Sequence, residues 1–235
     1  MHRDFSNPRH HRLIKRTRPE RRLAHALEGV LAQDSNPKEL ARILVEQKIC
    51  VPNSTMSCIE LATDHLDRVR SNIGNSLIAY VIYGGVAREL TKDGRHKDID
   101  VLVVTKREMK VPRLYRRINV QMVCKDLLGY DYLSKFTPAH LPSKLLKDDP
   151  AALRRTFALP IIPLYDTNGF VSHVRDIARK CLRVDDMKGY VDVHVTNRLR
   201  LLRSAGKKLT SEDEAAVREQ VMDELRVMND LKTLL

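Results

Sequence analysis

The chain contains no tryptophan, few other aromatic residues and no long apolar run. Aromatic residues make up 5% of its 235 residues. No apolar stretch approaches the roughly 20 residues that a membrane-spanning helix needs. The charged N-terminus also lacks the apolar segment of a secretory signal peptide. These absences predict a soluble, cytoplasmic protein with no membrane association.

Cysteine patterns that bind metals or form disulfide frameworks are missing as well. The cysteines are Cys50, Cys58, Cys124 and Cys181, and they show no CxxC spacing and no paired histidines at zinc-finger distance. We therefore expect neither a structural zinc site nor disulfides, and interpret the four as reduced thiols that mostly pack. The sequence also has no internal repeats and no low-complexity tracts.

What the chain has in excess is positive charge. Its formal net charge is +12 and its pI is near 9.7. Residues 1–22 contain eight Lys or Arg residues and two acids, so this segment alone carries +6. Such a charge predicts a polyanionic partner, either a nucleic acid or a nucleoside triphosphate. The residues expected to contact an RNA backbone are Arg9, Arg12, Lys15, Arg16 and Arg18.

Hydrophobic periodicity divides the chain into four parts. Residues 1–17 lack apolar periodicity and are expected to form a flexible basic tail. Residues 18–74 show helical spacing and predict an N-terminal helical cap, with helices at 19–31, 36–48 and 57–72. Residues 75–167 form the core, and residues 168–235 again show helical spacing.

The core contains the strand signals. A continuous apolar run at 77–83 ends at Gly84-Gly85, as expected of a buried strand. Further core elements are predicted as a short helix at 86–90 and strands at 99–104, 117–124 and 159–165. The helices of the last part are predicted at 171–182, at 187–203 and after Thr210. The predicted fold class is α+β: a small mixed sheet with flanking helices, an N-terminal helical cap and a C-terminal helical region.

Two short motifs in the core indicate the chemistry. Asp98 and Asp100 are spaced i, i+2 at the start of a strand, so both carboxylates project from one face and can share a divalent cation. Gly84-Gly85 ends the preceding strand and opens a helix, where bare backbone amides can approach phosphate oxygens. Further candidates for phosphate contacts are Arg88 and Lys97.

Gly84-Gly85, then twelve residues, then Asp98-Ile99-Asp100-Val101 resembles the signature of the nucleotidyltransferase superfamily related to DNA polymerase beta. That group includes kanamycin-type antibiotic nucleotidyltransferases, minimal nucleotidyltransferases of toxin and antitoxin pairs, and tRNA nucleotide-adding enzymes. The segment 163–170 is similar to the passage by which many small members enter their C-terminal helices. The resemblance implies Mg²⁺ or Mn²⁺ at the two aspartates, a nucleoside triphosphate as substrate, and phosphate contacts at the two glycines. It also implies a nucleotidyltransferase-type core at 75–167.

The sequence departs from that family at one place. Family members usually carry a third carboxylate on a following strand, where it completes the metal site or deprotonates the acceptor hydroxyl. The matching strand here has amides at its inward polar positions, and an acid follows only after the strand. The candidates for the third position are Asn119, Gln121 and Asp126. An amide oxygen can ligate a hard cation but cannot act as a base.

Two functions from different classes are consistent with these observations. The first is an enzyme that moves a nucleoside monophosphate from a nucleoside triphosphate to an acceptor hydroxyl and releases pyrophosphate. RNA, such as a tRNA end, is the expected acceptor, while a protein or small-molecule acceptor and a protein partner stay open. The alternative is a catalytically degenerate RNA-binding or scaffold subunit of a ribonucleoprotein assembly. A toxin or antitoxin role is a third hypothesis.

Overall fold

The computed structural model describes residues 52–88, 98–109, 115–136, 146–204, 206 and 208–228, with side chains of the last helix described up to Met222. The basic tail with its five proposed RNA contacts, the predicted helices at 19–31 and 36–48, Cys50 and Lys97 lie outside the described residues. Within the described ranges, no helix combines the length and apolar character needed to cross a membrane.

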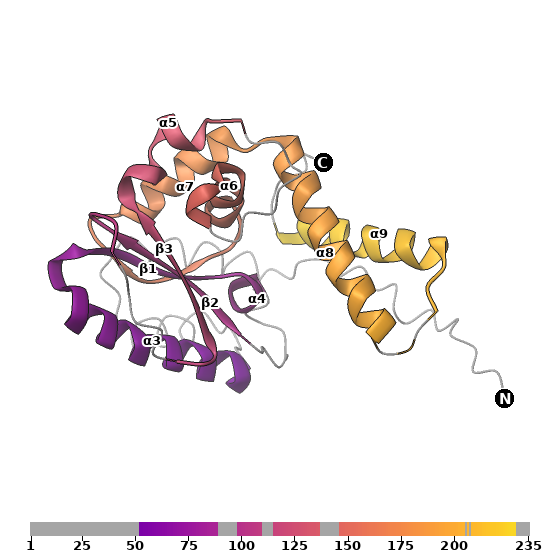
Figure 1. Cartoon of the computed structure of the whole chain (residues 1–235), viewed down its shortest axis with the longest axis horizontal. Coiled ribbons are helices and arrows are strands. Elements are labelled where there is room, and N and C mark those ends of the chain that lie inside the picture. The colour runs from indigo at the N-terminus through magenta and orange to yellow at the C-terminus, as the bar shows by residue number, and fades with distance from the viewer. Residues whose placement is uncertain are drawn as a thin grey trace.

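The described chain has an α+β fold around a mixed four-stranded sheet (Figure 1). The strands are β1 (Leu77–Tyr83), β2 (Ile99–Thr105), β3 (Ile118–Cys124) and β4 (Ile162–Asp166), in the order β3-β2-β1-β4. Strand β1 is antiparallel to β2 and β4, whereas β2 and β3 are parallel. This confirms the predicted mixed sheet. The last strand begins three residues later than predicted, because Leu159 and Pro160 end the preceding helix.

Helix α3 (Asn53–Ile73) covers one face of the sheet. Its apolar stripe, which includes Ile59, Leu66 and Val69, packs on residues of β1 and β2 such as Ile82 and Val101. A short 3-10 helix, η2 (Gly74–Ser76), connects α3 to β1. The predicted third helix of the cap is therefore present, and it begins four residues earlier than expected.

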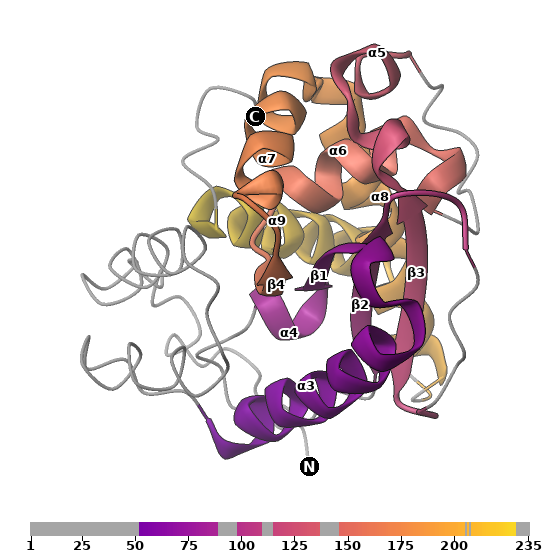
Figure 2. The same cartoon turned by 90° about the vertical axis from the view of Figure 1, so that its left-hand side faces the viewer.

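Three further helices cover the opposite face, as the rotated view shows (Figure 2). They are α5 (Tyr130–Leu133), α6 (Pro150–Ala158) and α7 (Phe170–Cys181), with 3-10 helices η3 (Lys125–Leu128) and η4 (Leu146–Asp148) between the strands and the longer helices. Helix α6 was not predicted from the sequence. Asp149 caps its N-terminus, because the Asp149 side chain accepts a hydrogen bond from the Ala152 backbone nitrogen at 3.1 Å, and Pro150 is the first residue of the helix.

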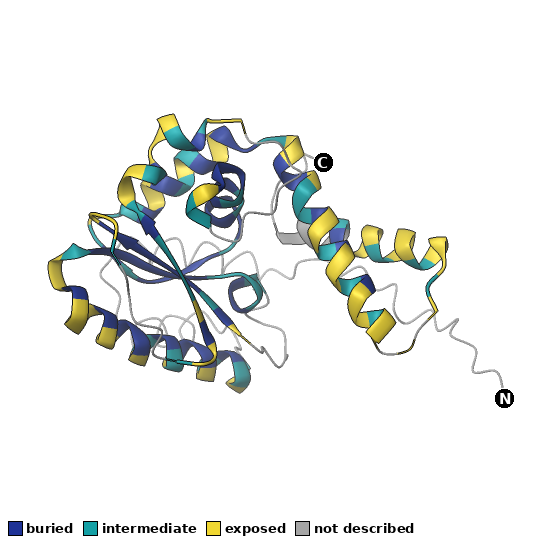
Figure 3. Cartoon of the chain, in the orientation of Figure 1, coloured by how far each residue is buried: buried dark blue, intermediate teal, exposed yellow. Residues whose placement is uncertain are grey.

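The last two helices, α8 (Val184–Ser204) and α9 (Ser211–Met228), pack on each other beside the sheet. Their shared core includes Met187, Val191 and Val195, and the outer surface of the pair is largely exposed (Figure 3). Helix α9 begins as predicted. The Asp213 backbone nitrogen donates to Thr210 Oγ1 at 3.2 Å, and the Thr210 backbone nitrogen donates to the Asp213 carboxylate at 3.0 Å.

A buried ion pair fixes α8 against the rest of the protein. Arg154 of α6 is 0% exposed and donates two hydrogen bonds to the Asp186 carboxylate, at 2.7 and 2.8 Å. Its Nη1 also donates to the carbonyls of Leu133 and Lys135, at 2.6 and 2.8 Å. Because these contacts join α5, α6 and α8 at one point, they set where α8 lies relative to the sheet.

Candidate functional site

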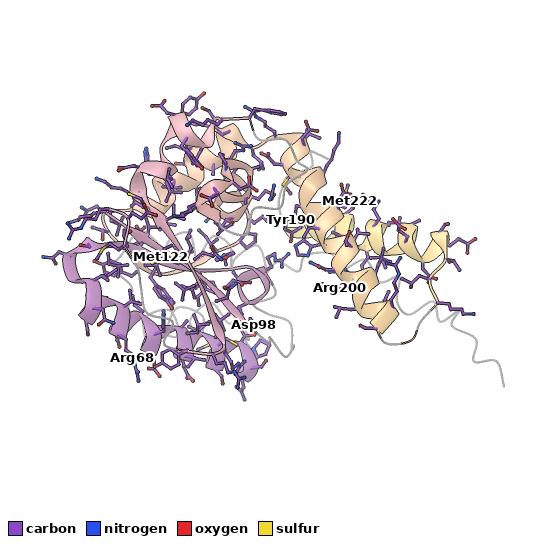
Figure 4. All side chains as sticks on the ribbon, in the orientation of Figure 1. Arg68, Asp98, Met122, Tyr190, Arg200 and Met222 are labelled. Carbon is purple, nitrogen blue, oxygen red and sulfur yellow. The ribbon has the colours of Figure 1, made fainter. Side chains whose placement is uncertain are left out.

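The two aspartates lie at one end of β2 on the face away from α3. Asp98 immediately precedes the strand and is exposed, and Asp100 is its second residue and is half-buried. Ile99 and Val101 pack in the core beneath α3, whereas Leu102 packs on the opposite face. Side chains alternate along a strand, so Asp98 and Asp100 share the face of Leu102, as predicted. Figure 4 labels Asp98 at this end of the strand.

Gly84 is required where β1 ends, because Asp100 lies against it. Tyr83 pairs with Asp100 in the sheet, and Gly84 follows with a φ of +73°. A Cβ at Gly84 would collide with Asp100 Oδ2 and would lie 3.3 Å from Asp100 Cβ and Cγ. Gly85 then begins the one-turn helix α4 (Gly85–Arg88). Gly84 of the glycine pair and Asp100 of the carboxylate pair, sixteen residues apart in sequence, therefore lie against each other.

Asn119 holds the carboxylate of Asp100. The two residues are directly paired between β2 and β3, and Asn119 Nδ2 donates to Asp100 Oδ1 at 3.0 Å. In this orientation, the amide nitrogen is engaged and the amide oxygen points away from the carboxylate. Gln121 pairs with Leu102, one step farther along the same face. Of the three candidates for the third position, Asn119 is the one in contact with the aspartates.

Asp126 is not brought to the carboxylate pair. It was a candidate only if β3 ended early, but the strand continues to Cys124, which pairs with Thr105. Cys124 comes five residues after Asn119 along the strand, a distance of about 16 Å. The Asp126 carboxylate instead accepts a hydrogen bond from Cys124 Sγ at 3.6 Å.

Burial raises the pKa of Asp100 above its usual value, and the negative charge of Asp98 acts in the same direction. The hydrogen bond from Asn119 and the positive charge of Arg88 oppose this shift. In the part of the chain that the structure describes, no three His, Cys, Asp or Glu side chains converge as a metal site. The two carboxylates still fit Mg²⁺, which commonly takes one or two protein carboxylates and completes its shell with water and phosphate.

A pocket of about 240 Å³ opens beside Asp100. One wall is the end of β1 with Gly84 and Arg88, a second is α6 with the segment after it, and the third is α8. The two helical walls were not assigned to the site from the sequence. Their polar and aromatic lining residues are Arg155, Thr156, Tyr190 and His194. The site is thus a cleft between an acidic strand end and a basic, aromatic helical wall.

Arg88 connects the two sides of this pocket. Its Nε donates to the Gly84 carbonyl at 3.1 Å, and its Nη1 donates to His194 Nε2 at 3.4 Å. Its guanidinium carbon lies 5.5 Å from the centre of the Tyr190 ring, and that ring lies 4.1 Å from the His194 ring. Figure 4 shows Tyr190 on α8. A ligand anion in the pocket would therefore meet Arg88 directly.

His194 is neutral at physiological pH. Burial lowers its pKa to about 4, with further contributions from the positive charges of Arg88, Arg198 and Arg155. The neutral form also agrees with its geometry, since Nε2 can accept from Arg88 only without a proton. The helical wall thus combines cationic guanidinium groups with an uncharged imidazole.

Two sequence signals could have indicated the helical wall. Asp149-Pro150 is a helix start, and Leu153 and Phe157 follow at helical spacing, which places Arg155 on α6. Tyr190 and His194 are spaced i, i+4 beside the apolar stripe of α8, so they share a helix face. Nothing in the sequence pairs that face with Asp100, about ninety residues earlier.

The sequence matches no known family model, and no curated protein is significantly similar to it.

Proposed function

We propose that this protein is a metal-dependent nucleotidyltransferase of the superfamily related to DNA polymerase beta. It would transfer a nucleoside monophosphate from a nucleoside triphosphate to an acceptor hydroxyl. The observation that supports this most is the contact between Gly84 and Asp100 on the rim of a pocket with a basic far wall. The mixed sheet, with the carboxylate pair opening β2, is compatible with the core of that superfamily.

Asp98 and Asp100 are the residues that would hold Mg²⁺ or Mn²⁺. When bound, the cation neutralises charge on the triphosphate. Asn119 keeps the Asp100 carboxylate in one orientation, so the carboxylate is already positioned before the nucleotide binds. In the reaction, the acceptor oxygen forms a bond to the α-phosphorus and its hydroxyl proton passes to solvent water, while the bond from that phosphorus to the oxygen bridging to the β-phosphorus breaks and pyrophosphate leaves. Because Asn119 cannot accept the hydroxyl proton, we expect slower transfer than a third carboxylate would allow.

The nucleotide would lie with its phosphates between Gly84-Gly85 and Arg88. Backbone amides at this glycine pair and the guanidinium group are both suited to phosphate oxygens. The pocket volume of about 240 Å³ is smaller than that of most ligand sites. It fits the nucleoside part, which would lie against Leu159 and Pro160, while the triphosphate extends along the rim toward Asp98.

RNA is the acceptor class that the charge favours. The net charge of +12 and the excess of arginine in the N-terminal segment suit contacts to a nucleic-acid backbone. Such contacts would increase affinity for many RNA sequences equally, so the choice of acceptor would depend on how its end enters the pocket.

The decisive experiment incubates the full-length protein with Mg²⁺, each labelled nucleoside triphosphate in turn and total cellular RNA. The wild type should label RNA, whereas an Asp98→Asn, Asp100→Asn double variant should not. Asp126→Asn is the matched control, because that acid lies at the other end of β3. Equal labelling by the double variant and the wild type would overturn the proposal.

One observation favours a second candidate, a degenerate RNA-binding or scaffold subunit. Asn119 stands beside Asp100 where a third carboxylate would complete the site, and its amide nitrogen is already bonded to Asp100. This candidate predicts that no nucleotide is transferred and that RNA affinity is the same in the double variant. That affinity should fall steeply as salt increases.

A further inference from the structure

His194 lies at the point where the pocket lining changes from the sheet side to the helical side. It lines the pocket with Asp100 and Gly84, accepts from Arg88 at 3.4 Å and stacks at 4.1 Å on Tyr190. The stacked tyrosine and the arginine together fix the imidazole with its Nε2 edge at Arg88. A ligand that binds the Nη1 side of Arg88 therefore also lies close to His194.

Charged groups reach His194 from several elements. Arg88 of α4, Arg155 of α6 and Arg198 of α8 all place positive charge near the ring. The titratable groups that share its pocket are Tyr83 of β1, Tyr190 of α8 and Asp100 of β2. Burial and Asp100 raise the pKa of Tyr83, so this phenol is neutral. The field at His194 is therefore dominated by guanidinium groups.

We propose that His194 is a phosphate-binding residue that takes up a proton when a polyphosphate binds beside Arg88 at the rim of the pocket and then donates a hydrogen bond to it. The proposal rests on the proposed function, because it takes the triphosphate of the nucleotide as the ligand. The proton comes from solvent and forms an N–H bond at Nε2, which ends the hydrogen bond that this nitrogen accepts from Arg88. No bond of the polyphosphate forms or breaks.

The chemical argument is one of charge balance. In the empty pocket, a protonated imidazole would add positive charge beside guanidinium groups in a partly buried place, which is unfavourable. A triphosphate carries several negative charges and reverses that balance, so the imidazolium becomes favourable next to it. A lysine or arginine at this position could not lose its charge as readily in the empty site.

The test is isothermal titration calorimetry of the full-length protein with a non-hydrolysable ATP analogue and Mg²⁺ at pH 7, in buffers that differ in ionisation enthalpy. The wild type should take up a proton on binding, and His194→Gln should take up none. Because uptake of one proton changes affinity about tenfold per pH unit, wild-type affinity should increase about 10- to 100-fold from pH 8 to pH 6, with a flat profile in the variant. His173→Gln, at an exposed histidine of α7, should behave like the wild type.

Inorganic tripolyphosphate separates the sources of the effect. Proton uptake on binding both tripolyphosphate and the nucleotide analogue supports recognition of the phosphates. Proton uptake with the nucleotide analogue alone would mean that contacts to the base or ribose cause it, and would overturn the proposal. Nucleotide binding without uptake in the wild type, or with equal uptake in His194→Gln, would also overturn it while leaving the proposed function intact. If no nucleotide binds at all, both proposals fail. Proton NMR of His194 gives an independent readout, since its midpoint should rise from about 4 when tripolyphosphate is added.

Discussion

The two faces of the central sheet are built from the same strands but differ in what they contain. Beneath α3, β1 and β2 contribute Ile82, Ile99 and Val101 to a closed core. The buried His65 of α3 is hydrogen-bonded there to the Tyr80 hydroxyl. On the other face the same strands present Asp100 and Tyr83 to an open pocket. Because successive side chains of a strand point to opposite faces, neighbouring residues of one strand serve different roles: one packs in the core and the next lines the pocket.

The two faces also differ in what holds their covering helices. Helix α3 is held mainly by its apolar stripe, together with the hydrogen bond between His65 and Tyr80. The pocket side depends in addition on the buried Arg154–Asp186 pair, which joins α6 to α8. The pocket face therefore combines an apolar core beneath α6 and α7 with a buried polar contact that positions α8.

The largest expected effect comes from breaking that ion pair. Asp186→Ala leaves the guanidinium group of Arg154 buried without its carboxylate, so the free energy of unfolding should fall by about 3–5 kcal/mol. Urea denaturation measures this. The matched control is Asp185→Ala, whose exposed partner Lys188 lies 3.4 Å away. This neighbour should change stability by less than about 1 kcal/mol. Similar losses for the two variants would mean that the buried pair does not hold α8.

The next effect concerns the site and not stability. Gly84→Ala and Gly74→Ala both place a side chain at positive φ, +73° and +50°. Each should therefore cost about 1–3 kcal/mol of backbone strain, with the larger cost expected at Gly74, whose ψ of −129° lies outside the left-handed helical region. The added Cβ at Gly84 also displaces Asp100, whereas nothing lies within 4 Å of a Cβ at Gly74.

Nucleotide transfer should therefore fall about a hundredfold in Gly84→Ala beyond the change in Gly74→Ala. Initial rates with saturating Mg²⁺ measure the difference, and circular dichroism shows whether both variants fold. If the two variants lose activity equally, the contact between Gly84 and Asp100 is not part of the site.

The face beneath α3 could be predicted from the sequence, because one strand and one helix with clear periods determine it. The apolar run of β1 was predicted at its observed bounds, and β2 and β3 to within one residue at either end. The same alternation predicted that Asp100 and Ile99 point to opposite faces of the sheet. On the pocket face, only the residues of the strand ends and of α4 were predicted. Arg155, Tyr190 and His194 were not, because they come from helices that meet Asp100 only through tertiary packing. The hydrogen bond from Asn119 was equally out of reach, since it depends on the parallel register of β2 and β3.

A smaller effect tests whether Asn119 orients Asp100. Asn119→Ala removes the donor to Asp100 Oδ1, and loss of such a supporting hydrogen bond typically lowers metal affinity about 10- to 100-fold. Gln121→Ala, on the same face of β3 beside Leu102, should leave the affinity unchanged. Mn²⁺ binding followed by electron paramagnetic resonance gives the constants without any need for turnover. Unchanged Mn²⁺ affinity in Asn119→Ala would show that Asp100 is oriented without it.

The smallest effect is on the closed face and depends on pH. His65 is fully buried, its Nδ1 shares a hydrogen bond of 2.9 Å with the Tyr80 hydroxyl, and burial followed by the charge of Arg68 lowers its pKa. In the unfolded chain histidine titrates near 6.5, so His65 adds nothing to the pH dependence above that value. As the pH falls below about 6.5 the unfolded state gains a proton that the folded state refuses, and stability is lost by at most about 1.4 kcal/mol per unit.

Comparing His65→Gln with the wild type at pH 7.5 and pH 5.5 isolates this contribution, because glutamine can still bond to Tyr80 but does not titrate. The loss of stability between the two pH values should be smaller in the variant. Tripolyphosphate should leave the difference between the two proteins unchanged, because His65 lies beneath α3 and the pocket opens on the other face. If the anion altered it, the two faces of the sheet would be coupled through the strands. The alternation of side chains would then give the two faces different residues, but the stabilities of the two faces would still depend on each other.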